Sequence, residues 1–115
     1  MNTKSIIPYD IFASVDIRSG TIVKAEAFPK AKKPAYQVWV DFGEEIGLKQ
    51  TSAQITVHYT AESLIGKQVL GCINLGEKII AGFKSEFLLL GFSDLNGDII
   101  LAAVDRAVPN GKHMH

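Results

Sequence analysis

The chain has 115 residues, of which 47% are hydrophobic and 21% charged, as expected for one globular domain with a substantial core. Its 12 basic and 12 acidic side chains cancel, so any affinity for nucleic acid must come from local clusters of charge. The single cysteine, Cys72, excludes an intrachain disulfide. No apolar stretch approaches the roughly 18 residues of a spanning helix, and the N-terminus lacks a signal-peptide pattern. We therefore expect a cytoplasmic protein with no membrane insertion.

The first expected strand spans residues 13–28 and follows a leader, residues 1–11, in which a helical turn could start at Asp10. Apolar and charged residues alternate along residues 13–28 with period two, which is typical of a strand with one wet face. Gly20 interrupts the alternation and predicts a bulge or sharp bend at that point. The apolar positions are the odd-numbered ones: Val15, Ile17, Val23, Ala25 and Ala27.

A lysine-rich loop between Pro29 and Pro34 separates the first expected strand from the second, residues 36–42. This loop is the densest basic cluster in the sequence. The third expected strand, residues 48–56, has strand propensity but little apolar area, which indicates either an exposed edge or a binding face. The basic residues of the loop and of the third strand are Lys30, Lys32, Lys33 and Lys49.

A short helix is expected over residues 60–66, with Thr60 as its N-cap and Gly66 as its C-cap. The fourth expected strand follows at residues 68–73. Further along the chain, the Asn96-Gly97 turn signal predicts a sixth strand over residues 98–104.

The stretch from residue 74 to residue 92 combines a glycine-marked loop with the fifth strand. Its loop carries Lys78 and Lys84. The apolar run at residues 87–90, which ends at Gly91, is typical of a buried strand. A polar doublet beginning at Ser85 stands at the entry to that strand, where binding residues are often displayed.

These elements predict an all-β, five-stranded OB-fold barrel with a short helix between strands 3 and 4. Another small antiparallel barrel or sandwich is the competing interpretation. The expected single domain, residues 1–115, divides into a leader (1–11), a barrel (12–92) and a C-terminal extension (93–115). The apolar leader and the sixth strand add surface that pairing of two copies would bury, which predicts a homodimer.

The sequence offers no catalytic constellation, no metal-ligand spacing and no phosphate-binding glycine loop. We therefore expect no enzymatic activity, no metal and no cofactor. The candidate ligands are scattered or terminal, and a flexible tail is expected for the last two of them: His58, Cys72, His113 and His115.

Binding features are better represented. In an OB barrel the loops between strands 1 and 2 and between strands 4 and 5 flank the ligand face, so lysines in both loops would line one groove. Lysine there holds a phosphate backbone without reading sequence. The alternative is that these loops are simply solvated. Polar side chains that could bond bases or ribose hydroxyls are Gln50, Thr51, Ser52, Gln54, Asn74 and Ser85.

Five blocks of sequence, in this order, resemble a known family: Val15-Asp-Ile-Arg-Ser-Gly-Thr-Ile-Val23, Lys33-Pro-Ala-Tyr36 with Val40-Asp-Phe-Gly43, Thr51-Ser-Ala-Gln-Ile-Thr56, Leu64-Ile-Gly-Lys-Gln-Val69, and Ser85-Glu-Phe-Leu-Leu-Leu-Gly91. The first block is similar to the opening signature of tRNA-binding OB domains, which also occur fused to aminoacyl-tRNA synthetases. The later blocks resemble the stand-alone CsaA family of export-related chaperones and tRNA-binding proteins. The resemblance covers about residues 10 to 112.

That resemblance implies an OB fold, a homodimer built with both terminal extensions, and neither enzymatic activity nor a metal. It implies structure-dependent binding of tRNA and chaperone-like binding of unfolded or precursor polypeptides. The alternative is a dedicated secretion chaperone for peptides or precursors, with weak or no RNA binding. The candidate RNA-binding residues are Lys30, Lys32, Lys33, Lys49, Asn74, Lys78, Lys84 and Ser85.

One departure from the family lies between Asn74 and Lys78, where the family usually carries two prolines. This chain has Leu75-Gly-Glu77 instead. Glycine in place of proline raises the entropy of the loop, and the carboxylate of Glu77 weakens phosphate attraction. We therefore expect weaker RNA affinity than is typical of the family.

Overall fold

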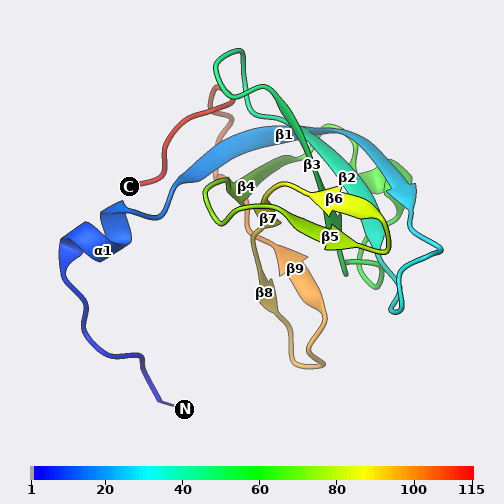
Figure 1. The fold of residues 1–115 in the computed structure, drawn as a ribbon, viewed down its shortest axis with the longest axis horizontal. Coiled ribbons are helices and arrows are strands. Elements are labelled where there is room, and N and C mark those ends of the chain that lie inside the picture. The colour runs from blue at the N-terminus through cyan, green and yellow to red at the C-terminus, as the bar shows by residue number, and fades with distance from the viewer. Residues whose placement is uncertain (1) are drawn as a thin grey trace.

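The computed structural model, which describes residues 2–115, is organised around one long strand, β1 (Ile17–Ala27). The second half of β1 pairs antiparallel with β2 (Tyr36–Asp41), and its first half pairs with β4 (Gln68–Cys72). On the outside, β3 (Leu48–Ala53) pairs with β2, and β7 (Leu88–Leu89) pairs with β4. The resulting order, β3-β2-β1-β4-β7, curls into a barrel of the expected type (Figure 1).

Hydrogen bonds between β3 and the segment before β7 close the barrel. The amide of Glu86 donates to the carbonyl of Gln50 (2.8 Å), and the Glu86 carboxylate accepts from the amide of Gln50 (3.0 Å). The hydroxyl of Ser85 accepts from the amide of Ser52 (2.9 Å). The buried Thr51 hydroxyl donates to the carbonyl of Phe87 (2.6 Å). The polar third strand is therefore the strand that closes the barrel.

The barrel interior is filled by aliphatic side chains around one aromatic pair. Phe42 and Phe87 meet edge to face, with ring centroids 5.0 Å apart. Gly20 belongs to this packing, because a Cβ atom placed there would lie 2.5 Å from Val40. The largest fully buried side chains are Phe42, Ile22, Leu64, Val38, Val40 and Val69.

The inward-facing positions predicted for β1 are wrong around Val23, whereas Ala25 packs against the core as predicted. The register of β1 against β2 shifts between Ile22 and Lys24, so the irregularity lies there and not at Gly20. Ile22 is fully buried, whereas Val23 is 47% exposed. An extra residue in one strand reverses which side chains face the core, and uninterrupted alternation cannot anticipate that reversal.

The short helix α2 (Ala61–Leu64) begins as predicted. The Thr60 hydroxyl accepts from the amide of Ser63 (3.0 Å), and the Ser63 hydroxyl accepts from the amide of Thr60 (3.0 Å), which forms a capping box. The C-cap is Ile65 rather than the predicted Gly66.

Two small hairpins replace features that the sequence predicted as a loop and a longer strand. The loop carrying Lys78 and Lys84 is a hairpin of β5 (Lys78–Ile80) and β6 (Phe83–Ser85). The sixth strand is shorter than predicted: β9 (Ile99–Leu101) pairs only with β8 (Gly91–Ser93).

The C-terminal segment returns to the barrel and lies beside the first half of β1. The amide of Ser19 donates to the carbonyl of Lys112 (3.0 Å), and the amide of Met114 donates to the carbonyl of Ile17 (2.8 Å). His113 forms an isolated β-bridge with Arg18 of β1. The predicted flexible tail is therefore wrong for His113, because backbone pairing with β1 holds it.

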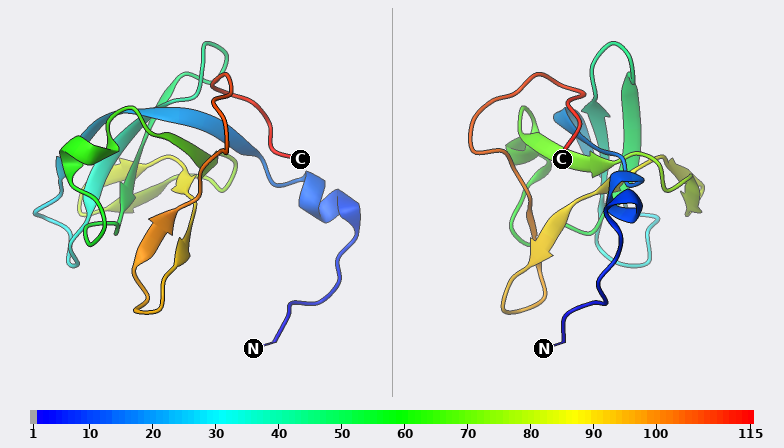
Figure 2. Two further views of the ribbon diagram at one scale, coloured as in Figure 1. Left: turned by 180° about the vertical axis from the view of Figure 1, so that it is seen from behind. Right: turned by 90° about the vertical axis from the view of Figure 1, so that its left-hand side faces the viewer.

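Two elements project from the barrel: the N-terminal segment with α1 (Tyr9–Ala13), and the β8–β9 hairpin (Figures 1 and 2). None of the α1 residues is buried. Neither helix within residues 2–115 is long and apolar enough to cross a membrane.

The register of β1 predicts opposite outcomes for two neighbouring truncations. Ile22→Ala should lower the free energy of unfolding by about 2–5 kcal/mol, because it leaves a cavity in the core. Val23→Ala should cost less than about 1 kcal/mol, because the side chain is exposed on a strand. Urea unfolding of both variants measures the difference. A larger loss for Val23→Ala would contradict the register.

Candidate nucleic-acid interface

The loop between β1 and β2 presents three lysines to solvent. Its base is closed by the amide of Phe28, which donates to the carbonyl of Ala35 (3.1 Å). Lys30, Lys32 and Lys33 are exposed, and within residues 2–115 none of them forms an ion pair. Their charges are therefore available to a ligand.

The β5–β6 hairpin is anchored over the outer face of the sheet next to that loop. The Phe83 ring lies edge-on to Phe28 (centroids 5.5 Å apart) and to Trp39 (5.9 Å). The two-residue turn has positive φ at both positions, 48° at Ala81 and 81° at Gly82, as a type I′ hairpin turn requires. This tight turn brings the hairpin tip to the lysine loop.

The lysine loop, the hairpin tip and the end of β3 enclose one cavity of about 430 Å³, which we call the basic cleft. No carboxylate lines it. A second cavity of about 360 Å³, between Lys30 and Phe83, adjoins the same loop and hairpin. The residues that line the basic cleft are Lys30, Ala31, Lys32, Lys33, Ala35, Ser52, Gln54, Ile80 and Ala81.

Lys78 and Lys84 lie on the strands of the hairpin rather than in the basic cleft. The ammonium group of Lys84 is 3.7 Å from the carboxylate of Glu77, whereas Lys78 has no ion pair among the described residues. The acidic residue in the departure from the family pattern therefore neutralises Lys84, although it is the direct sequence neighbour of Lys78.

Lys49 does not join the other lysines. It is paired in register with the buried Val40, whereas its neighbour Gln50 is paired with Trp39 on the outer face. Side chains directly opposite each other share a face of the sheet, so Lys49 starts from the core-facing side and reaches the rim of the barrel.

Asn74 and Ser85 have structural partners. The Asn74 side-chain oxygen accepts from the amide of Asp16 (2.9 Å), and its side-chain nitrogen donates to the carbonyl of Ser14 (2.7 Å). Asn74 thus ties the start of β1 to the end of β4. Ser85 is only 7% exposed, and its hydroxyl accepts one of the bonds that close the barrel.

Sequence reasoning missed an aromatic centre on the outer face of β1 and β2. Trp39 lies under Lys24, whose ammonium group is 4.6 Å from the centre of the ring. The indole N–H of Trp39 donates to the side-chain oxygen of Gln50 (3.1 Å). The position of Trp39 between the buried Val38 and Val40 was the available signal, because alternation places it on the outer face.

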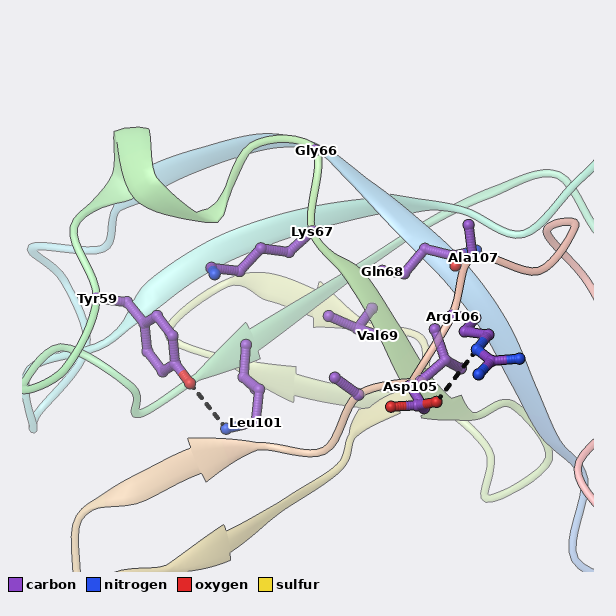
Figure 3. Close-up of a pocket in the computed structure, with 11 residues that line it drawn as sticks. Tyr59, Gly66, Lys67, Gln68, Val69, Leu101, Asp105, Arg106 and Ala107 are labelled. Carbon is purple, nitrogen blue, oxygen red and sulfur yellow. Dashed lines mark hydrogen bonds and ion pairs between the residues drawn. The ribbon is translucent and has the colours of Figure 1, made fainter.

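Figure 3 shows another cavity, of about 450 Å³, under the segment that follows β9. Its lining includes Tyr59, whose hydroxyl accepts from the amide of Leu101 (3.0 Å), and Lys67. The carboxylate of Asp105 is 3.6 Å from the guanidinium of Arg106, so the positive charge of this cavity is partly balanced. This cavity shares no lining residue with the basic cleft.

The profile of the family described as "Putative tRNA binding domain" matches residues 17–113, which is most of the chain. The chain belongs to this tRNA-binding-domain family. The matched range includes the barrel strands and the lysine loop. The predicted resemblance to tRNA-binding OB domains is confirmed.

Two solved structures and one sequence relative show the same relationship. Chaperone CsaA from Bacillus anthracis is 41% identical with a TM-score of 0.90, and the similarity covers 96% of this chain and 100% of that one. CsaA from Picrophilus torridus is 39% identical with a TM-score of 0.88 and the same coverage. The predicted OB-type fold is thereby confirmed. Methionine–tRNA ligase from Methanothrix thermoacetophila is 38% identical over 108 residues, which are 94% of this chain but 15% of the ligase.

Proposed function

We propose that the chain is a non-enzymatic, CsaA-like protein that binds tRNA in a structure-dependent manner through the basic cleft. The observation that supports this most is the meeting of three lysines without ion pairs, Lys30, Lys32 and Lys33, with the tip of the β5–β6 hairpin around one cavity. A tRNA partner would place this activity in the cytoplasm.

The chemistry of the cleft suits backbone recognition. Lysine ammonium groups bind phosphates without reading sequence. Ser52 and Gln54 line the same cavity and offer hydroxyl and amide groups to ribose 2′-hydroxyls. The Trp39 ring is already in contact with Phe83 and with the ammonium group of Lys24, so stacking of a base on Trp39 contributes little to RNA binding. RNA shape is the feature that this surface recognises.

The remaining candidate residues have different roles in this proposal. Lys78 extends the positive charge along the hairpin, and Lys84 contributes less because Glu77 neutralises it. Lys49 contributes from the barrel rim. Asn74 and Ser85 position the strands instead of contacting RNA.

Removal of the three loop charges tests the tRNA proposal. The triple variant Lys30→Gln/Lys32→Gln/Lys33→Gln should weaken tRNA binding about tenfold or more at low salt. It should also reduce the slope of log affinity against log salt by about 2 to 3, because fewer counterions are released. Fluorescence titration with tRNA at several salt concentrations measures both quantities.

The matched control removes three lysines outside the cleft, in the variant Lys4→Gln/Lys67→Gln/Lys112→Gln. This control keeps the same net charge as the loop variant and should retain most of the affinity. Equal losses in the two triple variants would show that only overall charge matters and would contradict the cleft. A tRNA complex that is insensitive to salt would contradict the proposal altogether.

The Glu77→Gln substitution should have the opposite effect on tRNA affinity. Removing the carboxylate frees Lys84, so tRNA binding should strengthen about threefold at low salt, and the gain should vanish at high salt. The same titration measures it. Unchanged or weaker binding would contradict a role for the hairpin lysines.

The second candidate function is chaperone-like binding of unfolded or precursor polypeptides in protein secretion, by a homodimer with weak or no RNA binding. Its support is the apolar surface on the two projecting elements, together with the CsaA chaperones among the similar structures. We propose that a second copy covers part of this surface and that the rest contacts client chains. The exposed apolar side chains of these elements are Ile6, Ile7, Tyr9, Ile11, Phe12, Phe92, Leu95 and Ile100.

Replacement of two apolar side chains on α1 tests the homodimer. Ile11→Ser/Phe12→Ser should raise the dimer dissociation constant about tenfold or more, because an apolar contact is lost. Analytical ultracentrifugation measures the mass. Leu48→Ser, at an exposed position of β3 and outside both projecting elements, is the control. If the parent protein is a monomer, or the double variant has an unchanged dissociation constant, the proposed interface is wrong.

A further inference from the structure

A cluster of three metal-ligating side chains joins the projecting β8–β9 hairpin to the barrel. His58 lies in the segment between β3 and α2, whereas Asp94 and Asp98 lie at the two ends of the hairpin turn. One ligand atom from each side chain lies within 4.8 Å of the other two. The imidazole Nε2 of His58 is 2.6 Å from a carboxylate oxygen of Asp94.

The turn presents the Asp94 carboxylate in a fixed orientation. One of its oxygens accepts from the amides of Asn96 (2.8 Å) and Asp98 (2.9 Å). The other oxygen is thereby directed at His58. The hydrogen bond from His58 and those from the backbone lower the pKa of Asp94.

The charge of the cluster is not balanced by lysine or arginine. No Lys or Arg side chain in residues 2–115 forms an ion pair with Asp94 or Asp98. Two carboxylates this close repel each other, and within residues 2–115 the only side chain that bonds to either of them is the imidazole of His58. A divalent cation would remove the repulsion.

We propose that His58, Asp94 and Asp98 form a binding site for a first-row divalent transition-metal ion, with zinc as the best match. One imidazole nitrogen and two carboxylate oxygens suit zinc, whereas calcium and magnesium prefer an all-oxygen set. Ligand atoms around a tetrahedral zinc ion are about 3.4 Å apart, so small side-chain rotations would suffice.

The site has room for further ligands. Asp98 also lines a cavity of about 370 Å³ between the hairpin turn and the segment after β3, and Lys33 lines the same cavity. Water or a substrate anion can therefore complete the coordination sphere. The bound ion would link two segments whose nearest ligands are 36 residues apart in the chain, and would fix the hairpin against the barrel.

Metal titration of the His113→Ala/His115→Ala variant, prepared without an affinity tag, tests the proposal. This variant lacks the terminal imidazoles that would compete for metal. Cobalt serves as a visible probe and zinc is measured by competition with a chromophoric chelator. We expect one ion per chain. His58→Gln, Asp94→Asn and Asp98→Asn should each weaken binding about tenfold or more. Glu62→Gln, an exposed carboxylate on α2, is the control and should bind normally.

A heteronuclear NMR spectrum of each variant shows whether it is folded and which residues respond to metal. Shifts confined to residues 56–58 and 94–98 would support the site. The proposal is overturned if saturable binding is absent in the His113→Ala/His115→Ala protein. It is also overturned if a folded His58→Gln variant and a folded Asp98→Asn variant both bind metal as tightly as that protein.

Discussion

The hydrogen bonds between β3 and the segment from Lys84 to Phe87 fix the geometry on which the basic cleft depends. This segment follows directly from the β5–β6 hairpin, so the bonds that close the barrel also decide where the hairpin lies. The Gln50 side chain adds a further link, because its amide donates to the carbonyl of Lys84 (2.9 Å). Each such bond contributes only about 1 kcal/mol, but together they hold the hairpin tip at the lysine loop.

Local signals in the sequence predicted the elements that local chemistry determines. The strand predicted over residues 36–42 and the N-cap predicted at Thr60 are both present, because each depends on neighbouring residues. The polar strand β3 was open to two interpretations because the partners of its second edge, the one not paired with β2, lie more than thirty residues away. The β5–β6 hairpin was missed because Ala81 adopts a left-handed conformation that Asn or Gly usually indicates.

In the candidate site, too, the sequence shows the residues that cluster locally but not the long-range contacts that position the others. The cluster of Lys30, Lys32 and Lys33 is visible in the sequence, and the structure places it in one cavity with the hairpin tip. The face on which Lys49 lies depends on strand register, and the structural role of Asn74 depends on a contact 58 residues away. His58 looked isolated for the same reason, since its acidic neighbours come from a distant turn. Long-range pairing therefore determines which polar residues are free for binding.

A map of the tRNA contact surface tests the central claim most directly. Backbone amide shifts of the isotope-labelled protein are recorded with and without tRNA at low salt. The account predicts that perturbations concentrate at residues 30–35, 52–54 and 79–84, around the basic cleft. Asn74 and the cavity next to Lys67 should remain unperturbed. Perturbations centred on that cavity or on α1, with the lysine loop unchanged, would contradict the account.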